Sequence, residues 1–300
     1  MRPQRQGAVV TAWCRMLWEG GSVVAARQNG ALRPVSAAGQ PVSDLHPIIR
    51  GEMLAADLDF QAPVPVAEAE LLAPIGSFPR NIFCIGKNYR AHALEFTASG
   101  FDASAGAAAP TDAIPAAPIV FSKPFTSVIG PGDVIESHPH LTSKLDYEAE
   151  LAVVIGRGGR DVALADALDH VFGYTIVNDV TARDRQQHHR QWLLGKGMDT
   201  FCPMGPAVVT AEEIDLDNTV VECRINGELR QKASVADLIF DVPTLIRDLS
   251  AGMTLVPGDV IATGTPAGVG IGFDPPRFLK PGDEVSATIE PIGTLTNRIG

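Results

Sequence analysis

Two glutamates stand directly before an apolar run in the segment LDYEAELAVVIG, residues 145–156. Side chains alternate across a strand, so Glu148 and Glu150 would share one face, about 7 Å apart. Carboxylates that converge at the edge of a core repel each other and lose hydration. The usual result is a raised pKa on one of them or a bound cation. An exposed strand start, with both carboxylates in water, is the alternative that the residue types leave open.

A third carboxylate, Asp179, ends another apolar run, VFGYTIVND. Three carboxylates form the all-oxygen donor set that suits Mg²⁺ or Mn²⁺, with waters completing an octahedron. Spacing along the chain does not show that the two strands are neighbours in the sheet. The metal site is therefore a hypothesis about the fold as well as about the chemistry.

A histidine and a glutamate lie three residues apart in GKNYRAHALEF, residues 86–96. On a helical turn His92 and Glu95 would share one face, so the carboxylate could hold the imidazole. A Glu-oriented histidine is a suitable general base near neutral pH. A chance histidine near a surface glutamate is the alternative. The Ala-, Ser-, Gly- and Pro-rich segment between His92 and Pro118 predicts a mobile surface loop.

Glycines flank the lysine of LGKGMDTF. They allow close backbone approach to a ligand, and Lys196 could then neutralise an anionic substrate or a developing oxyanion. An ordinary solvated lysine is the alternative.

Two other segments contain candidate polar groups. The loop ATGTPAGVG, residues 262–270, suits the presentation of backbone N–H groups to a carboxylate. Arg183 and the adjacent Asp184 indicate a structural ion pair.

The elements that must position these residues are mostly strands. Apolar runs of strand length recur from residue 81 onward, and Asn226-Gly227 is a strong hairpin signal. The clearest helix is predicted over FDVPTLIRDLSAGM, with Asp241 as its N-cap and Gly252 as its C-cap. Two more helices are expected within residues 161–170 and 180–193. We predict a small N-terminal β domain and linker over 1–78 and a β-rich α+β catalytic domain with a few covering helices over 79–300.

Composition limits the class of protein. The chain has 300 residues, 45% of them hydrophobic, and 24 basic against 35 acidic residues give a net charge of −11. Without a basic stripe, this charge disfavours a nucleic-acid or anionic-membrane partner. No segment approaches membrane-spanning length. The four cysteines are far apart and form no Cys-x-x-Cys pair. They indicate neither a disulfide framework nor a thiolate zinc site, so a reducing cytoplasm is expected.

Five motifs occur in order over about residues 80–300: YEAELAVVIG, GYTIVNDVTARD, GKGMDTFCPMGP, INGELRQ and PGDVIATGTPAGVG. Together they resemble the fumarylacetoacetate hydrolase family. The resemblance implies a mixed β-sandwich or β-roll catalytic domain, the N-terminal β module of longer members, and a homodimer. It also implies a Mg²⁺ or Mn²⁺ ion on Glu148, Glu150 and Asp179, and a catalytic lid dyad of His92 and Glu95.

Further roles follow from the same resemblance. Lys196 would line the metal site and act in catalysis. Substrate contacts are expected from Gln186, Thr265, Lys123 and Arg90, although for Lys123 a structural role is equally open.

A divalent ion with open positions matches a 2-oxo acid, whose carboxylate and carbonyl chelate it together. The first hypothesis is divalent-metal-dependent hydrolysis of a C–C bond in a 1,3-diketo acid of the acylpyruvate or fumarylpyruvate type, through a metal-stabilised pyruvate enolate. Oxaloacetate decarboxylation is the second. Isomerase or hydratase action on 2-hydroxymuconate-type products of aromatic catabolism is less favoured, because such family members often lack the His-x-x-Glu dyad. A non-catalytic scaffold is disfavoured because the acidic set is complete.

Overall fold

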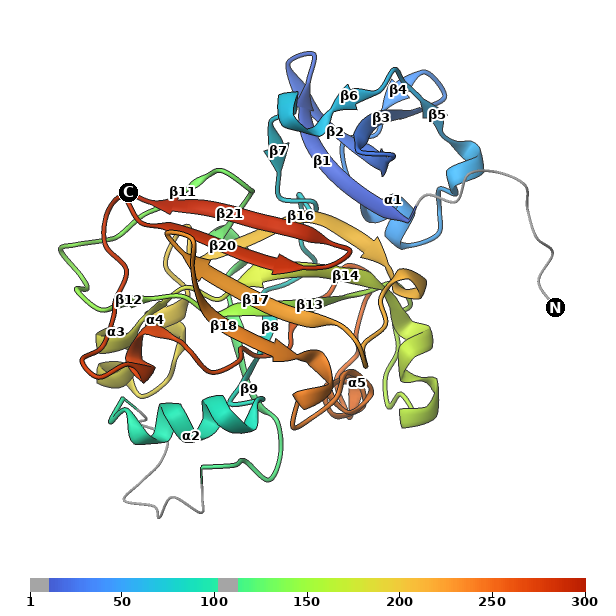
Figure 1. Ribbon diagram of the computed structural model, residues 1–300. Helices are drawn as coiled ribbons and strands as arrows, with labels where there is room; N and C mark the ends of the chain where they lie inside the picture. The colour runs from blue at the N-terminus through green and yellow to red at the C-terminus, as the bar shows by residue number, and fades with distance from the viewer. Residues whose placement is uncertain (1–10, 102–112) are drawn as a thin grey trace.

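A large mixed β-sheet organises the molecule (Figure 1). The structure is a computed structural model that describes residues 11–101 and 113–300. A second, five-stranded sheet accompanies the large one. Few helices accompany them. The predicted β-rich architecture with a few covering helices is confirmed.

The central strands of the large sheet are buried on both faces. They are β8 (Ile82–Gly86), β13 (Ala149–Ile155), β14 (Val171–Asn178), β16 (Cys202–Thr210) and β19 (Val260–Ala262). The strand β9 (Ile119–Lys123) pairs with β8 at the end of the sheet and is more exposed. Along β13, Leu151 and Val153 face one apolar cluster while Ala152 and Val154 face another. Because successive side chains point to opposite faces, both halves of the alternation must be apolar, which explains the continuous hydrophobic run.

The second sheet covers one face of the first. It comprises β11 (Val134–Ile135), β17 (Val220–Ile225), β18 (Glu228–Ser234), β20 (Glu284–Ile289) and β21 (Gly293–Ile299). Its apolar side chains belong to the same core cluster as Leu151 and Val153. The predicted Asn-Gly hairpin joins β17 to β18, with φ of 51° at Asn226 and 81° at Gly227. Positive φ at both positions is the requirement of a type I′ turn.

The N-terminal module is also built of strands. It contains β1 (Ala12–Trp18), β2 (Gly21–Gln28), β3 (Ala31–Ala37), β4 (Gln40–Pro41), β5 (Asp59–Phe60), β6 (Val64–Pro65), β7 (Leu71–Leu72) and the short helix α1 (His46–Ile49). β1 pairs with β2 and, through Ala12 opposite Val209, with β16. The module therefore continues the large sheet, whose strands follow the order β4-β3-β2-β1-β16-β14-β13-β19-β8-β9. The second sheet follows the order β11-β21-β20-β17-β18. The division at residues 78 and 79 stays a prediction.

The described helices are short. Besides α1 they are α2 (Arg90–Ala98), α3 (Arg183–His189), α4 (Leu193–Lys196) and α5 (Val242–Ser250). Asp241 caps α5 as predicted, since its Oδ1 accepts from the Thr244 N–H at 2.9 Å. The C-cap is Ala251, one residue before the predicted Gly252, and Gly252 follows it with the left-handed φ of 81° that is typical of a glycine ending a helix. Residues 164–170 form a 3₁₀ helix, where an α-helix was expected.

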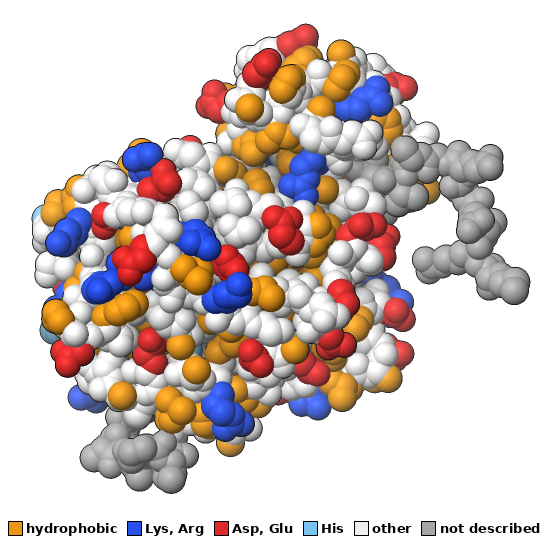
Figure 2. Space-filling model, in the orientation of Figure 1, with side chains coloured by type: hydrophobic (Ala, Val, Ile, Leu, Met, Phe, Trp, Pro, Cys, Tyr) orange, Lys and Arg blue, Asp and Glu red, His pale blue; other side chains and the backbone are white. Residues whose placement is uncertain are grey.

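Three other predictions concern the surface and the cysteines. Residues 102–112 of the expected loop lie outside the described residues. Within residues 11–101 and 113–300, no helix is long and apolar enough to cross a membrane. All four cysteines are free and buried, as packing residues. Figure 2 shows acidic and basic side chains interspersed on the visible face.

Candidate metal and acid–base site

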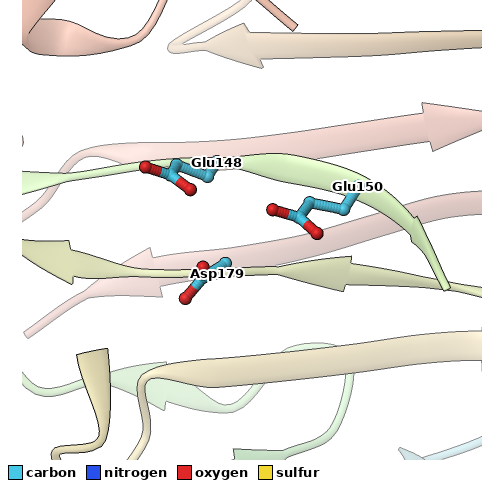
Figure 3. Close-up of side chains that lie close together, drawn as sticks. All are labelled: Glu148, Glu150 and Asp179. Carbon is cyan, nitrogen blue, oxygen red and sulfur yellow. The ribbon is translucent and has the colours of Figure 1, made fainter. Parts of the chain in front are cut away.

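The three acidic residues meet where β13 begins and β14 ends. Ala149 pairs with Asn178, which places Glu148 and Glu150 of one strand beside Asp179 of the next. The Asp179 N–H donates to the Glu148 carbonyl at 2.8 Å. One carboxylate oxygen from each residue lies within 4.8 Å of the others, and the side chains converge in Figure 3. Their exposed fractions are 5%, 1% and 0%, so the alternative of a solvated strand start is wrong.

Lysines compensate part of this buried negative charge. Lys196, at the end of α4, donates from Nζ to Glu148 Oε2 at 2.9 Å and to Asp179 Oδ2 at 2.6 Å. Lys123, at the end of β9, donates to the other Asp179 oxygen at 2.6 Å. Burial raises the pKa of Glu148, but Lys196 and then Arg183 outweigh it and lower that pKa to about 2. Glu148 is therefore held as a carboxylate.

Glu150 differs from Glu148 in its surroundings. Its Oε2 accepts the Gly264 N–H at 2.8 Å. Burial, followed by the charges of Asp179 and Glu148, raises the pKa of Glu150 well above its usual range. An ionised Glu150 would thus add a negative charge that the neighbouring cations do not fully compensate, and a divalent cation would supply that compensation. Glu148, Glu150 and Asp179 therefore fit an oxygen-coordinated divalent ion.

The candidate dyad lies on α2, which Figure 1 shows on the opposite side of the molecule from the N-terminal strands. His92 Nδ1 lies 3.1 Å from Glu95 Oε2, so the expected helical contact is present. The other carboxylate oxygen accepts the Gly268 N–H at 2.9 Å. His92 is buried and lines the cleft beside the carboxylates. With Nδ1 directed at Glu95, Nε2 is the nitrogen left for proton transfer.

One cleft brings several of the predicted residues together. His92, Glu148, Gln186, Lys196 and Thr265 all line it. Thr265 Oγ1 donates to the Ala149 carbonyl at 2.9 Å and accepts from Gln231 Nε2 at 2.7 Å. The remaining lining residues are Ile85, Gly86, Lys87, Phe96, Phe121, Arg183 and Trp192.

Two predicted substrate contacts lie outside this lining. Lys123 is fully buried behind Asp179, where Nζ also contacts the carbonyls of Val180 and Lys196. That position favours the structural one of its two predicted roles. Arg90 is exposed on α2.

The predicted ion pair of Arg183 with Asp184 was wrong. Arg183 Nε donates to Asp146 Oδ2 at 2.8 Å, and Nη2 lies 2.7 Å from Glu148 Oε1. Asp184 instead accepts from Thr142 Oγ1 at 2.6 Å. Adjacent residues of a helix point in different directions, so proximity in sequence is a poor guide to pairing.

Asp146 was missed from the sequence. It is buried, and its carboxylate also accepts the Gly270 N–H at 2.6 Å. The signal was available, because Asp146 precedes Glu148 by two residues and so shares its face. Lys87 is a second contributor to the cleft, buried and with a left-handed φ of 55°. Its ammonium lies 5.5 Å from the centre of the Phe96 ring.

Comparison with known proteins connects this site to named relatives. The family model described as "Fumarylacetoacetate (FAA) hydrolase C-terminal" matches residues 81–300. The chain is 54% identical over 236 residues to oxaloacetate tautomerase YisK of Bacillus subtilis, covering 78% of this chain and 74% of that protein. It is 42% identical over 243 residues to the mitochondrial oxaloacetate tautomerase FAHD2B of Homo sapiens, covering 80% and 72%.

Solved structures agree with these matches. A fumarylacetoacetate hydrolase from Exiguobacterium antarcticum superposes with a TM-score of 0.81 at 39% identity, covering 96% of this chain and 99% of that one. A 2-hydroxyhepta-2,4-diene-1,7-dioate isomerase from Mycobacterium marinum gives 0.74 at 36% identity, covering 96% and 98%. From its matched sequence, its fold and its acidic site, the chain is an enzyme that belongs to the fumarylacetoacetate hydrolase family.

Proposed function

We propose that this enzyme interconverts the keto and enol forms of a small 2-oxo dicarboxylic acid, with oxaloacetate as the first substrate to test. The observation that carries the proposal is the cleft that His92 shares with Glu148, one of the three clustered carboxylates. A proton-transfer group thus lies beside a residue that could help to hold a Lewis acid. The relatives named oxaloacetate tautomerase, at 54% and 42% identity, support this substrate.

Each residue has a role in such a reaction. A divalent ion on Glu148, Glu150 and Asp179 would supply Lewis acidity toward the 2-oxo group. His92 Nε2 takes a proton from C3 and returns it to the C2 oxygen, while Glu95 keeps the imidazole oriented. No C–C bond needs to break, and the proton taken equals the proton returned.

The charge of the cleft favours an anionic substrate. Lys87, Arg183 and Lys196 all contribute to its lining. These cations suit an anionic substrate in spite of the acidic chain as a whole.

Hydrolysis of an acylpyruvate is the second candidate, because the same dyad could instead activate water. The carboxylate-held imidazole, 3.1 Å from Glu95, is the observation that favours it. Oxaloacetate decarboxylation would use the same metal site but requires no water. These alternatives differ in products, so one set of assays separates them.

The test follows two signals on the same samples. Loss or gain of the enol ultraviolet band reports tautomerisation, and a coupled lactate dehydrogenase assay reports pyruvate release. We expect rapid tautomerisation of oxaloacetate with Mg²⁺ or Mn²⁺, abolished by EDTA and by His92→Ala. The exposed His188→Ala is the matched control and should retain full activity. Pyruvate release from acetylpyruvate or fumarylpyruvate, without tautomerisation, would refute the first proposal in favour of hydrolysis.

The ion and the assembly form part of the same proposal. An all-oxygen donor set supports Mg²⁺ or Mn²⁺ over softer metals. A homodimer rests on the family resemblance, and light scattering of the purified enzyme tests it.

A further inference from the structure

One backbone segment, Gly264–Gly272, contacts both the acidic cluster and the candidate dyad; we call it the glycine loop. Its Gly264 N–H donates to Glu150 Oε2 at 2.8 Å, and its Gly268 N–H donates to Glu95 Oε1 at 2.9 Å. Its Gly270 N–H donates to Asp146, the carboxylate that holds Arg183, at 2.6 Å. The loop therefore links a candidate metal ligand to the candidate acid–base dyad.

The Glu95 side chain fills the space beside Gly272. A Cβ atom on Gly272 would lie 1.8 Å from Glu95 Oε1 and 2.3 Å from Glu95 Cδ. A side chain at this position and the observed Glu95 carboxylate thus exclude each other. Gly268 is constrained differently, because its φ of 103° and the nearby Arg230 carbonyl both disfavour a side chain.

The Glu95 carboxylate is consequently held at both oxygens. Gly268 fixes Oε1, and Oε2 faces His92 Nδ1 at 3.1 Å. A carboxylate fixed at two points cannot rotate freely, so it defines the plane and tautomer of the imidazole that it contacts.

We propose that the glycine loop is a positioning element that sets the orientation of His92 through Glu95 and ties it to the carboxylate site. Gly268 supplies the hydrogen bond, and Gly272 supplies the space. The catalytic consequence rests on the proposed role of His92 as the proton-transfer group. The structural part, that Gly272 controls the His92–Glu95 contact, stands independently.

Gly272→Ala is the direct test. The obstacle to its methyl group is the far end of a flexible side chain, and Gly272 is outside the left-handed region, so the variant should fold. The methyl group should displace the Glu95 carboxylate. We expect kcat for oxaloacetate to fall about 10- to 100-fold, as for other misplaced catalytic groups. KM and Mn²⁺ affinity, measured by calorimetric titration, should be unchanged. The matched control is Gly21→Ala, at a position with no heavy atom within 4 Å.

A double-mutant cycle separates positioning from general damage. In a Glu95→Ala background the carboxylate is gone, so Gly272→Ala should cause no further loss of kcat. An equal loss in both backgrounds would overturn the proposal, because the effect would then bypass Glu95.

A second readout needs neither metal nor turnover. Nitrogen-15 NMR of the metal-free enzyme, with His92 assigned by His92→Asn, reports which imidazole nitrogen carries the proton. We expect the Nδ1–H tautomer in the wild type and its loss in both Gly272→Ala and Glu95→Ala. The same tautomer in the wild type and Gly272→Ala would contradict the inference. If no 2-oxo acid is turned over, the proposed function fails, while this spectrum still decides the role of the loop.

Discussion

Replacing Glu150 by glutamine should make the metal-free enzyme more stable than the wild type, and the metal-loaded enzyme less stable than the wild type. Glu150 is 1% exposed and its carboxylate oxygen lies within 4.8 Å of oxygens of Glu148 and Asp179. Two like charges at that separation repel by about 3.5 kcal/mol at an effective dielectric constant of 20. Lys196 and the Gly264 N–H offset part of this repulsion. A larger repulsion would cause Glu150 to bind a proton instead. Because protonating an ordinary glutamate at pH 7 costs about 3.5 kcal/mol, the free-energy penalty of burying Glu150 among like charges does not exceed that value.

We therefore expect Glu150→Gln to stabilise the metal-free enzyme by about 1–3 kcal/mol, which corresponds to a rise in Tm of about 2 to 6 °C. With Mn²⁺ at about 1,000 times its Kd, the wild type gains about 4.1 kcal/mol by mass action. The variant, having lost a ligand, gains much less. Without metal the variant should melt higher, and with metal the wild type should.

The sign of the pH dependence follows from the raised pKa of Glu150. Between the ordinary range of a glutamate and the raised value, the folded state binds more protons than the unfolded state. Stability of the metal-free wild type should therefore fall as pH rises through that window, and Glu150→Gln should lack this loss. Glu148, with a pKa of about 2, acts in the opposite sense and at lower pH, so the two effects are separable.

Thermal melting in EDTA and in Mn²⁺, from pH 5 to pH 8, provides the measurement. The exposed Glu212→Gln is the matched control and should melt as the wild type does under every condition. A variant less stable than wild type in EDTA at pH 7, or equal stabilisation of both by Mn²⁺, would refute the reasoning.

Three further outcomes are expected. His92→Ala should lower kcat about 10²- to 10⁴-fold, the usual contribution of a general acid–base group, with Mn²⁺ binding intact by calorimetry. Arg183→Lys should destabilise the enzyme by about 3 kcal/mol in urea unfolding, because lysine cannot hold Asp146 and Glu148 together; an unchanged unfolding free energy would contradict this. Asp241→Ala should remove about 1 kcal/mol through loss of the α5 cap, read from the shift in urea midpoint.

Local patterns predicted much of the fold. The hairpin at Asn226-Gly227 and the Asp241 cap depend on residues adjacent in sequence, so they could be predicted without knowledge of the rest of the chain. The segment 161–170 could not. Its backbone is tied at Gly156, whose N–H donates to the His170 carbonyl at 2.8 Å. A short segment with anchored ends has little to gain from a regular α-helix, and it forms a 3₁₀ helix.

The contacts of the candidate site could likewise be predicted only where they depend on local spacing. The shared face of Glu148 and Glu150 follows from the two-residue period of a strand, and the His92–Glu95 contact follows from the helical period. Arg183 shows where this reasoning ends. A buried guanidinium needs carboxylates within hydrogen-bond reach, and its partners come from residues 146 and 148 of a different segment.

The sequence by itself therefore determined the residue types, their local spacing and the family to which the motifs belong, because strand and helix periodicity act over a few residues. Only the tertiary structure decided which groups meet. The β13–β14 register brings Asp179 to the glutamates, and α2 packs so that Glu95 reaches the glycine loop. These contacts join segments far apart in the chain, and the packing of the whole core sets them.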